Sequence, residues 1–197
     1  MSANPYLKPD ERNVLERAVV GIAGAGGLGS NCAMHLVRAG VRKLVIADFD
    51  VVNESNLNRQ FFFRDQLGMR KVEAVKANLL RIDPEAEIAA LDVKLDADNV
   101  RELLGGCDVI VEAFDAVEAK TMILAALMPT GTPLVTASGL AGWGRSNAIR
   151  VRRMGRVVAV GDGETDVSEN APSSPRVGIA AAMEANAVVS ILLGKEL

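Results

Sequence analysis

The chain contains the stretch Val19-Val-Gly-Ile-Ala-Gly-Ala-Gly-Gly-Leu-Gly29, in which an apolar run ends in a glycine turn. A helical pattern follows over residues 30–38. Gly24, Gly26 and Gly29 match the spacing G-x-G-x-x-G, whose glycines allow a tight turn, a close approach of backbone amides to phosphate, and close packing of helix on strand. The helix start adds free N–H groups and a partial positive charge. The stretch therefore predicts a strand, a turn and a helix that bind nucleotide phosphates, although the spacing alone does not tell which nucleotide.

Apolar strands and helical patterns alternate along the rest of the chain. Strands are predicted at 44–47, 88–93, 108–115 and 133–138, and helices begin near residues 71, 117 and 177. This alternation with short connections predicts a parallel, doubly wound sheet. Residues 148–151 and 156–160 predict an antiparallel hairpin at its edge. We therefore expect a Rossmann-like α/β fold with a mostly parallel sheet, as a single domain at 18–197.

A polar segment at 1–17 precedes this domain and is expected to be helical in part. Pro9-Asp10-Glu11 resembles a helix start, with Asp10 as a possible cap. Arg12 and Arg17 lie in the same segment, where surface charge is their simplest interpretation.

Composition excludes several classes of function. The 197 residues carry a net charge of −3 and no basic block, which disfavours nucleic acid as the main partner. The two cysteines, Cys32 and Cys107, belong to no C-x-x-C pair, so a cysteine zinc site is not expected. No signal peptide is evident, and the late apolar stretch 177–193 contains Glu184, which favours a buried helix over a membrane span. We expect a cytoplasmic protein without a membrane partner.

Polar residues follow several predicted strands. Asp48 lies 19 residues beyond Gly29, where a carboxylate can accept hydrogen bonds from ribose, although a turn aspartate is an equal alternative. Asp115 ends a central strand and is expected to face the ligand crevice. Lys71 falls in the first turn of a helix, where cations are unusual. A bound anion would explain Lys71, and surface charge is the alternative.

The order and spacing of these elements resemble the ThiF/MoeB/HesA family, relatives of ubiquitin-activating enzymes that adenylate small sulfur-carrier proteins. The resemblance covers nearly the whole chain, and its most specific part is Ser55-Asn-Leu-Asn-Arg-Gln60 followed by Gly68-x-x-Lys71. It rests on the following segments: Gly24-Ala-Gly-Gly-Leu-Gly-Ser30, Asp48-Phe-Asp50, Ser55–Gln60, Gly68–Lys71 and Asp115. Glu112-Ala-Phe-Asp115 and Ser138-Gly-Leu-Ala-Gly142 are most similar to the short ThiF-like branch, which resembles thiamine-pathway enzymes.

The resemblance implies an ATP-dependent adenylyltransferase that uses Mg²⁺ and acts on the C-terminal glycine of a ubiquitin-like sulfur carrier ending in Gly-Gly. Asp48 would bind the ribose of ATP, Asn56, Arg59 and Lys71 would hold the triphosphate, and Asp115 would bind magnesium. Arg12 is the candidate for an arginine that reaches the phosphates of the partner in a homodimer. The implied nucleotide-binding residues are Gly24, Gly26, Gly27, Gly29, Asp48, Asp50, Asn56, Arg59 and Lys71.

The chain also departs from the family pattern. It lacks the two C-x-x-C pairs that bind zinc in longer members, and residues 161–176 contain no cysteine for a thioester or persulfide. Phe114-Asp115-Ala116 stands where many relatives have Thr-Asp-Asn. Adenylation is therefore implied, whereas covalent sulfur transfer on this chain is not. Two alternatives stay open: an NAD-dependent oxidoreductase, and a non-catalytic subunit of a heterodimeric activating enzyme.

Overall fold

A seven-stranded sheet runs through the molecule in the order β3-β2-β1-β4-β5-β7-β6. The computed structural model describes residues 4–166 and 168–197. All neighbouring strands are parallel except β6 and β7, which pair antiparallel at one edge. The strands are β1 (Val19–Ala23), β2 (Lys43–Asp48), β3 (Glu87–Asp92), β4 (Val109–Glu112), β5 (Leu134–Ala137), β6 (Arg150–Met154) and β7 (Val157–Gly161).

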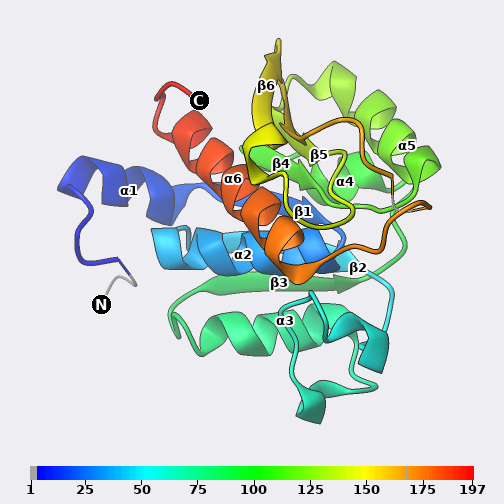
Figure 1. The fold of residues 1–197 in the computed structure, drawn as a ribbon. Helices are drawn as coiled ribbons and strands as arrows, with labels where there is room; N and C mark the ends of the chain where they lie inside the picture. Colours follow the sequence, from blue (N-terminus) through cyan, green and yellow to red (C-terminus); the bar gives the residue numbers. More distant parts are fainter. Residues whose placement is uncertain (1–3, 167) are drawn as a thin grey trace.

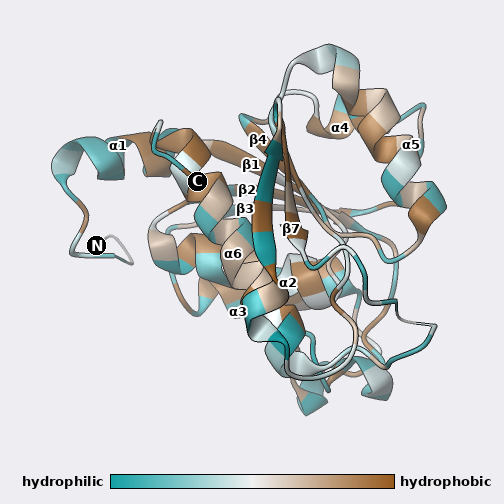
Figure 2. Ribbon diagram, turned by 45° about the horizontal axis from the view of Figure 1, so that its top comes forward, coloured by the Kyte–Doolittle hydropathy of each residue, from teal (hydrophilic) through white to brown (hydrophobic). Residues whose placement is uncertain are grey.

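Helices cover both faces of the sheet, as Figure 2 shows. One face carries α2, α3 and α6, and the side-by-side packing of α2 and α6 is plain in Figure 1. The other face carries α4 and α5, which enclose a second apolar cluster. The helices are α1 (Pro9–Arg17), α2 (Gly27–Ala39), α3 (Lys71–Leu80), α4 (Val100–Leu104), α5 (Val117–Leu127) and α6 (Ser174–Leu192).

Burial explains why the central strands are mostly apolar. All four residues of β4 and of β5 are buried, because helices pack on both of their faces. The long helix α6 is apolar and long enough to cross a membrane by composition, but it packs against α2 and three strands. Glu184 is fully buried in this helix, as expected for a core element that the sequence analysis predicted.

The predicted fold class is confirmed, with differences at element ends. The predicted edge hairpin is present, and β7 inserts between β5 and β6 as a parallel neighbour of β5. Asp10 does not cap α1: Lys8 holds the N-cap position, and Pro9 occupies the first turn, where its missing N–H costs nothing.

Candidate functional site

The glycine turn lies between β1 and α2, at the carboxyl end of the sheet's centre. Gly24 adopts φ of +101°, which favours glycine, and its amide donates to the Ala47 carbonyl oxygen at 2.8 Å. A Cβ at Gly29 would lie 1.8 Å from the Gly24 carbonyl oxygen, so only glycine fits this approach of helix to turn. No side chain caps the start of α2 at Gly26. The first amides of α2 are thus available to an anion.

Asp48 organises this turn from the end of β2. One carboxylate oxygen accepts from the Ala25 amide at 2.7 Å, and the other accepts from the Asp50 amide at 2.8 Å. The two proposed roles of Asp48 are therefore compatible, because each oxygen can accept a second hydrogen bond. Asp48 is the turn aspartate of the alternative interpretation, and it also lines a cleft beside the glycine turn.

Lys71 is buried, which excludes the surface-charge interpretation. Its side chain is 8% exposed, and its ammonium lies 2.8 Å from the carboxylate of Asp50, whose side chain is 50% exposed. The Lys71 amide also donates to the Asp50 carbonyl oxygen at 2.9 Å. A largely buried cation whose one carboxylate partner is half in solvent is placed to bind an additional anion.

Asp115 lies just beyond β4 and is exposed at the mouth of the cleft. Its position depends on Glu112, which is fully buried and accepts from the Phe114 amide at 2.7 Å. Glu112 in turn binds the Lys120 ammonium at 2.9 Å and the Thr136 hydroxyl at 2.5 Å. The sequence analysis missed Glu112 and Lys120 as supports of this turn, although an acidic residue inside an apolar strand was visible.

The cleft holds about 100 Å³ and collects most of the predicted residues. It is lined by Gly24, Gly26, Ala47, Asp48, Phe49, Asp50, Gln60, Lys71, Val93, Leu95, Ala113, Phe114 and Asp115. Gln60 is 8% exposed, and its carbonyl oxygen has no hydrogen-bond partner among the described residues. A larger open depression of about 460 Å³ lies over Val19, Lys43 and Ile88 and contains none of the predicted site residues.

Asn56 and Arg59 lie next to the cleft and not in its lining. The Asn56 carboxamide accepts from the Asn53 amide at 2.9 Å, within the short 3-10 helix Glu54–Asn56. The Arg59 guanidinium donates to the Asn58 carboxamide at 2.9 Å. Arg59 still borders the glycine turn, because a Cβ at Gly27 would lie 3.5 Å from the Arg59 Cγ.

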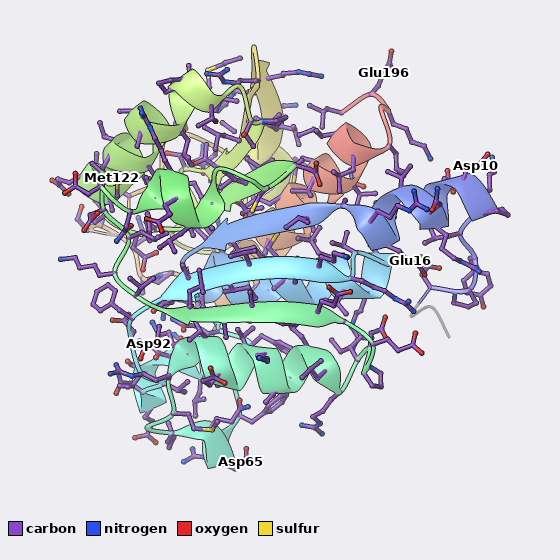
Figure 3. All side chains as sticks on the ribbon, turned by 180° about the vertical axis from the view of Figure 1, so that it is seen from behind. Asp10, Glu16, Asp65, Asp92, Met122 and Glu196 are labelled. Atoms are coloured by element: carbon purple, nitrogen blue, oxygen red, sulfur yellow. The ribbon has the colours of Figure 1, made fainter. Side chains whose placement is uncertain are left out.

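Arg12 is remote from the cleft of its own chain. It belongs to α1, which precedes the amino end of β1, and Figure 3 shows Asp10 and Glu16 of this helix at the opposite end of the strands from Asp92. The Arg12 Nε is buried without a hydrogen-bond partner in the described part of the chain. A role for Arg12 thus requires a second copy of the chain and stays a prediction.

A second glycine-rich turn, residues 139–147, is held by Arg176, which the sequence analysis did not single out. The buried guanidinium donates to the Gly144 carbonyl oxygen at 2.6 Å and pairs with Asp162 at 2.7 Å. Burial disfavours ionised Asp162, but hydrogen bonds from Thr165, Glu164 and Arg176 outweigh burial and lower the Asp162 pKa to about 2.

These features define a nucleotide-binding site of the doubly wound α/β class, with a phosphate-binding turn and acidic residues at strand ends. The chain belongs to the ThiF family, whose model matches residues 3–197.

Several relatives are adenylyltransferases. The molybdopterin-synthase adenylyltransferase of Salmonella typhimurium is 28% identical over 189 residues, 92% of this chain and 75% of that protein. The Escherichia coli sulfur carrier protein ThiS adenylyltransferase is 33% identical over 131 residues, 66% of this chain and 52% of that protein. An adenylyltransferase and sulfurtransferase of Aedes aegypti is 35% identical over 127 residues, 64% of this chain and 29% of that protein.

Solved structures share the fold at lower identity. Escherichia coli tRNA N6-threonylcarbamoyladenosine dehydratase in complex with AMP superposes with a TM-score of 0.88 at 22% identity, over 98% of this chain and 93% of that one. Escherichia coli MccB with ATP gives a TM-score of 0.74 at 21% identity, over 92% and 58% of the two chains. At these identities the likeness establishes the Rossmann-type fold and nothing about the reaction.

Proposed function

We propose that this chain is an ATP-dependent adenylyltransferase that activates the C-terminal carboxylate of a ubiquitin-like sulfur carrier. The observation that carries the proposal is the convergence of the glycine turn, Asp48, Lys71 and Asp115 on one cleft in a chain of the ThiF family. The names of the relatives support the same activity, and solved neighbours were complexed with ATP or AMP.

The reaction forms one bond and breaks another at the α-phosphorus of ATP. A carrier carboxylate oxygen attacks that phosphorus, and the bond to the bridging oxygen breaks, so that pyrophosphate leaves with the electron pair. The carboxylate is already ionised at neutral pH, so no general base is needed. Negative charge grows on the pyrophosphate, and the buried Lys71 ammonium is positioned to stabilise it.

Other residues bind and orient the nucleotide. The free amides at the start of α2 bind phosphate oxygens, and Asp48 accepts from the ribose hydroxyls while it holds the turn. Arg59 reaches the phosphates by turning away from Asn58, its partner in the present structure. Asn56 fixes the loop that carries Arg59.

The donor set suits a magnesium ion. Asp115 is an exposed carboxylate at the cleft with no partner among the described residues, and Mg²⁺ prefers one or two carboxylates together with phosphate oxygens. When bound there with ATP, the ion would neutralise phosphate charge. Within residues 4–166 and 168–197, no group of three His, Cys, Asp or Glu side chains could hold a metal by itself. We propose that the enzyme uses no zinc.

The finer assignments are part of the same proposal. We infer a ThiS-type carrier and a step in thiamine biosynthesis, because the carrier named for the Escherichia coli relative is ThiS. We also propose a homodimer in which Arg12 acts on the partner's cleft, one domain at 18–197 after the segment 1–17, and a cytoplasmic location without membrane or nucleic-acid partners. The molybdopterin-synthase relative makes a molybdopterin-type carrier the direct competitor.

An ATP–pyrophosphate exchange assay tests the function. Wild-type protein should exchange with a carrier ending in Gly-Gly and not with the same carrier truncated by two residues. Asp115→Asn should abolish exchange, whereas Asp65→Asn, a change at an exposed carboxylate outside the cleft, should not. Exchange with neither ThiS-type nor molybdopterin-type carriers would refute the proposal. Stabilisation by NAD instead of ATP would favour an oxidoreductase.

A further inference from the structure

Four arginines lie on the edge strand β6 and in the turn that follows it. Arg150, Arg152 and Arg153 are exposed in β6, and Arg156 is half-buried at the start of β7. Met154, between them, is 61% exposed. The chain as a whole has a net charge of −3, so this concentration of positive charge is local.

These four arginines lack carboxylate partners within the described chain. Arg152 donates to the Asp162 carbonyl oxygen at 3.2 Å, and Arg153 donates to the Gly155 carbonyl oxygen at 3.0 Å. The Arg156 guanidinium donates to the Met128 sulfur at 3.7 Å. Arg145, nearby in the second glycine turn, does have an acidic partner, because it pairs with Glu164 at 3.1 Å. The positive charge of β6 is therefore available to pair with acidic groups of another molecule.

β6 also offers a free strand edge. Among the described residues it pairs only with β7, so its outer N–H and C=O groups are open to another strand. Charged side chains on an edge can serve merely to prevent aggregation, most often as lysines. Arginine and exposed methionine are instead enriched in protein interfaces.

We propose that β6 docks an acidic edge strand of the ubiquitin-like carrier, a proposal that rests on the adenylyltransferase function. Arg150 pairs with Gly161, and Val160 pairs with Ala137, so the start of β6 lies at the same end of the sheet as the cleft. Three strand spacings separate β6 from β4, or about 14 Å at about 4.8 Å each. Four or five extended residues, at about 3.3 Å each, span that distance.

A docked carrier would thus send its C-terminal tail over the second glycine turn to Asp115. A nucleic acid would also be attracted by the arginines, but it has no β-strand that could pair with the free edge of β6. The acidic pI of about 5.3 also disfavours nucleic acid. The protein partner is therefore the one that uses both features of β6.

The test is a binding titration with the full-length chain and a fluorescent ThiS-type carrier ending in Gly-Gly. The variant Arg150→Glu/Arg153→Glu leaves Arg152 and its contact to Asp162 in place. Its control is Arg38→Glu/Arg81→Glu, which makes the same charge change at exposed sites outside β6. The β6 variant should raise the Kd about tenfold or more at low salt, and the control less than about twofold. Equal Kd values for wild type and the β6 variant would overturn the proposal, as would binding of bulk tRNA in place of the carrier.

Two further measurements separate docking from chemistry and from misfolding. The neutral variant Arg150→Gln/Arg153→Gln should weaken binding less than charge reversal, and lysines on the carrier's acidic edge should restore binding to the Glu variant. In exchange assays, the β6 variant should raise the carrier KM while kcat and ATP affinity stay unchanged. Exchange with an unchanged KM leaves the proposed function standing and removes the docking proposal. Arginine-dependent binding without exchange supports the docking proposal and refutes the adenylyltransferase function. Absence of binding and of exchange refutes the two proposals together.

Discussion

Asp48 combines a structural and a ligand-binding role in a single carboxylate. Because it accepts from the Ala25 and Asp50 amides, Asp48→Ala should loosen the glycine turn as well as remove the ribose acceptor. A hydrogen bond to a charged group contributes roughly 1.5–3 kcal/mol, so ATP affinity should fall by about tenfold or more. Calorimetric titration of the folded variant measures this loss. Asp65→Ala, at an exposed aspartate outside the cleft, is the control, and unchanged ATP affinity in Asp48→Ala would disprove the ribose role.

Lys71 makes the sharpest residue-scale prediction. Its burial means that the alanine variant would leave a cavity, so Lys71→Met, which keeps the volume, is the better test. Lys71→Met removes only one partner of the ion pair, but the Asp50 carboxylate is half-exposed and stays solvated, so the variant should still fold. Exchange should nevertheless fall by on the order of 10²–10³, as for loss of one preorganised charge.

The matched control for Lys71 lies in the same helix. Lys76→Met removes a lysine of α3 that is outside the cleft lining. It should exchange like wild type. Equal exchange rates in Lys71→Met and wild type would show that Lys71 serves only to pair with Asp50.

Sequence reasoning found the residues that contact the cleft better than those that support them. Gly24, Asp48 and Asp115 were predictable because they follow or end predicted strands, and Lys71 because a cation is unusual in the first turn of a helix. Glu112 and Arg176 were not, since their roles depend on partners more than 20 residues away, at Thr136 and Gly144. Gln60 was quoted in the segment that carries the resemblance, but nothing in the sequence indicated that its carbonyl oxygen would be buried without a partner.

At the scale of elements, alternation predicted every strand and the class of the sheet, but not the strand order at its far edge. β7 lies beside β5, and β6 is outermost, so the connection after β5 passes over β7. Alternation does not encode this choice, but composition distinguishes the two strands. β6 carries three arginines and is mostly exposed, as an edge strand can be, whereas β7 is apolar and mostly buried between two strands.

The helix α6 carries an unusual carboxyl, that of Glu184. Burial raises the Glu184 pKa to about 8, and the Glu112 carboxylate adds to the increase while the Lys120 ammonium opposes it. Burial raises the pKa of the Cys32 thiol in α2, and Glu184 adds to that increase. Neither carboxyl oxygen has a hydrogen-bond partner among the described residues. The folded state therefore keeps the proton on Glu184 at neutral pH.

This pKa predicts a pH dependence of stability. The unfolded state ionises above about 4.5 and the folded state above about 8, so the contribution of Glu184 is fully present below pH 4.5 and is lost as pH rises through 8. The free energy of unfolding should thus fall by on the order of a few kcal/mol across this window. In urea titrations, the free energy of unfolding of Glu184→Gln relative to that of wild type should be higher at pH 8.5 than at pH 5. The exposed Glu118→Gln should show no such difference, and a parallel pH profile for Glu184→Gln and wild type would contradict the assignment.

At the scale of the whole molecule, ligand binding should be visible as stability. A ligand at 100 times its Kd stabilises the folded state by about 2.7 kcal/mol. For a chain of 197 residues this raises the melting temperature by roughly 5–10 °C. ATP with magnesium should produce this increase, and NAD should not. Asp115→Asn should reduce the part of the shift that requires magnesium, and an equal response to NAD and ATP would disprove the nucleotide assignment.

The buried Arg176–Asp162 pair reinforces the backbone hydrogen bonds that join the second glycine turn to the segment after β7, such as the one from the Asp162 amide to the Gly139 carbonyl oxygen. The guanidinium binds carbonyls of the second glycine turn, and Asp162 binds the amides of Glu164 and Thr165. In kinetic terms, these two loops have one opening event in common, so amide hydrogens of both should exchange with solvent at a single rate. Arg176→Met should accelerate exchange in both loops, as measured by mass spectrometry. Because the Asp162 pKa is about 2, its carboxylate stays ionised down to about pH 4, and the rate of this shared opening should not change above that pH.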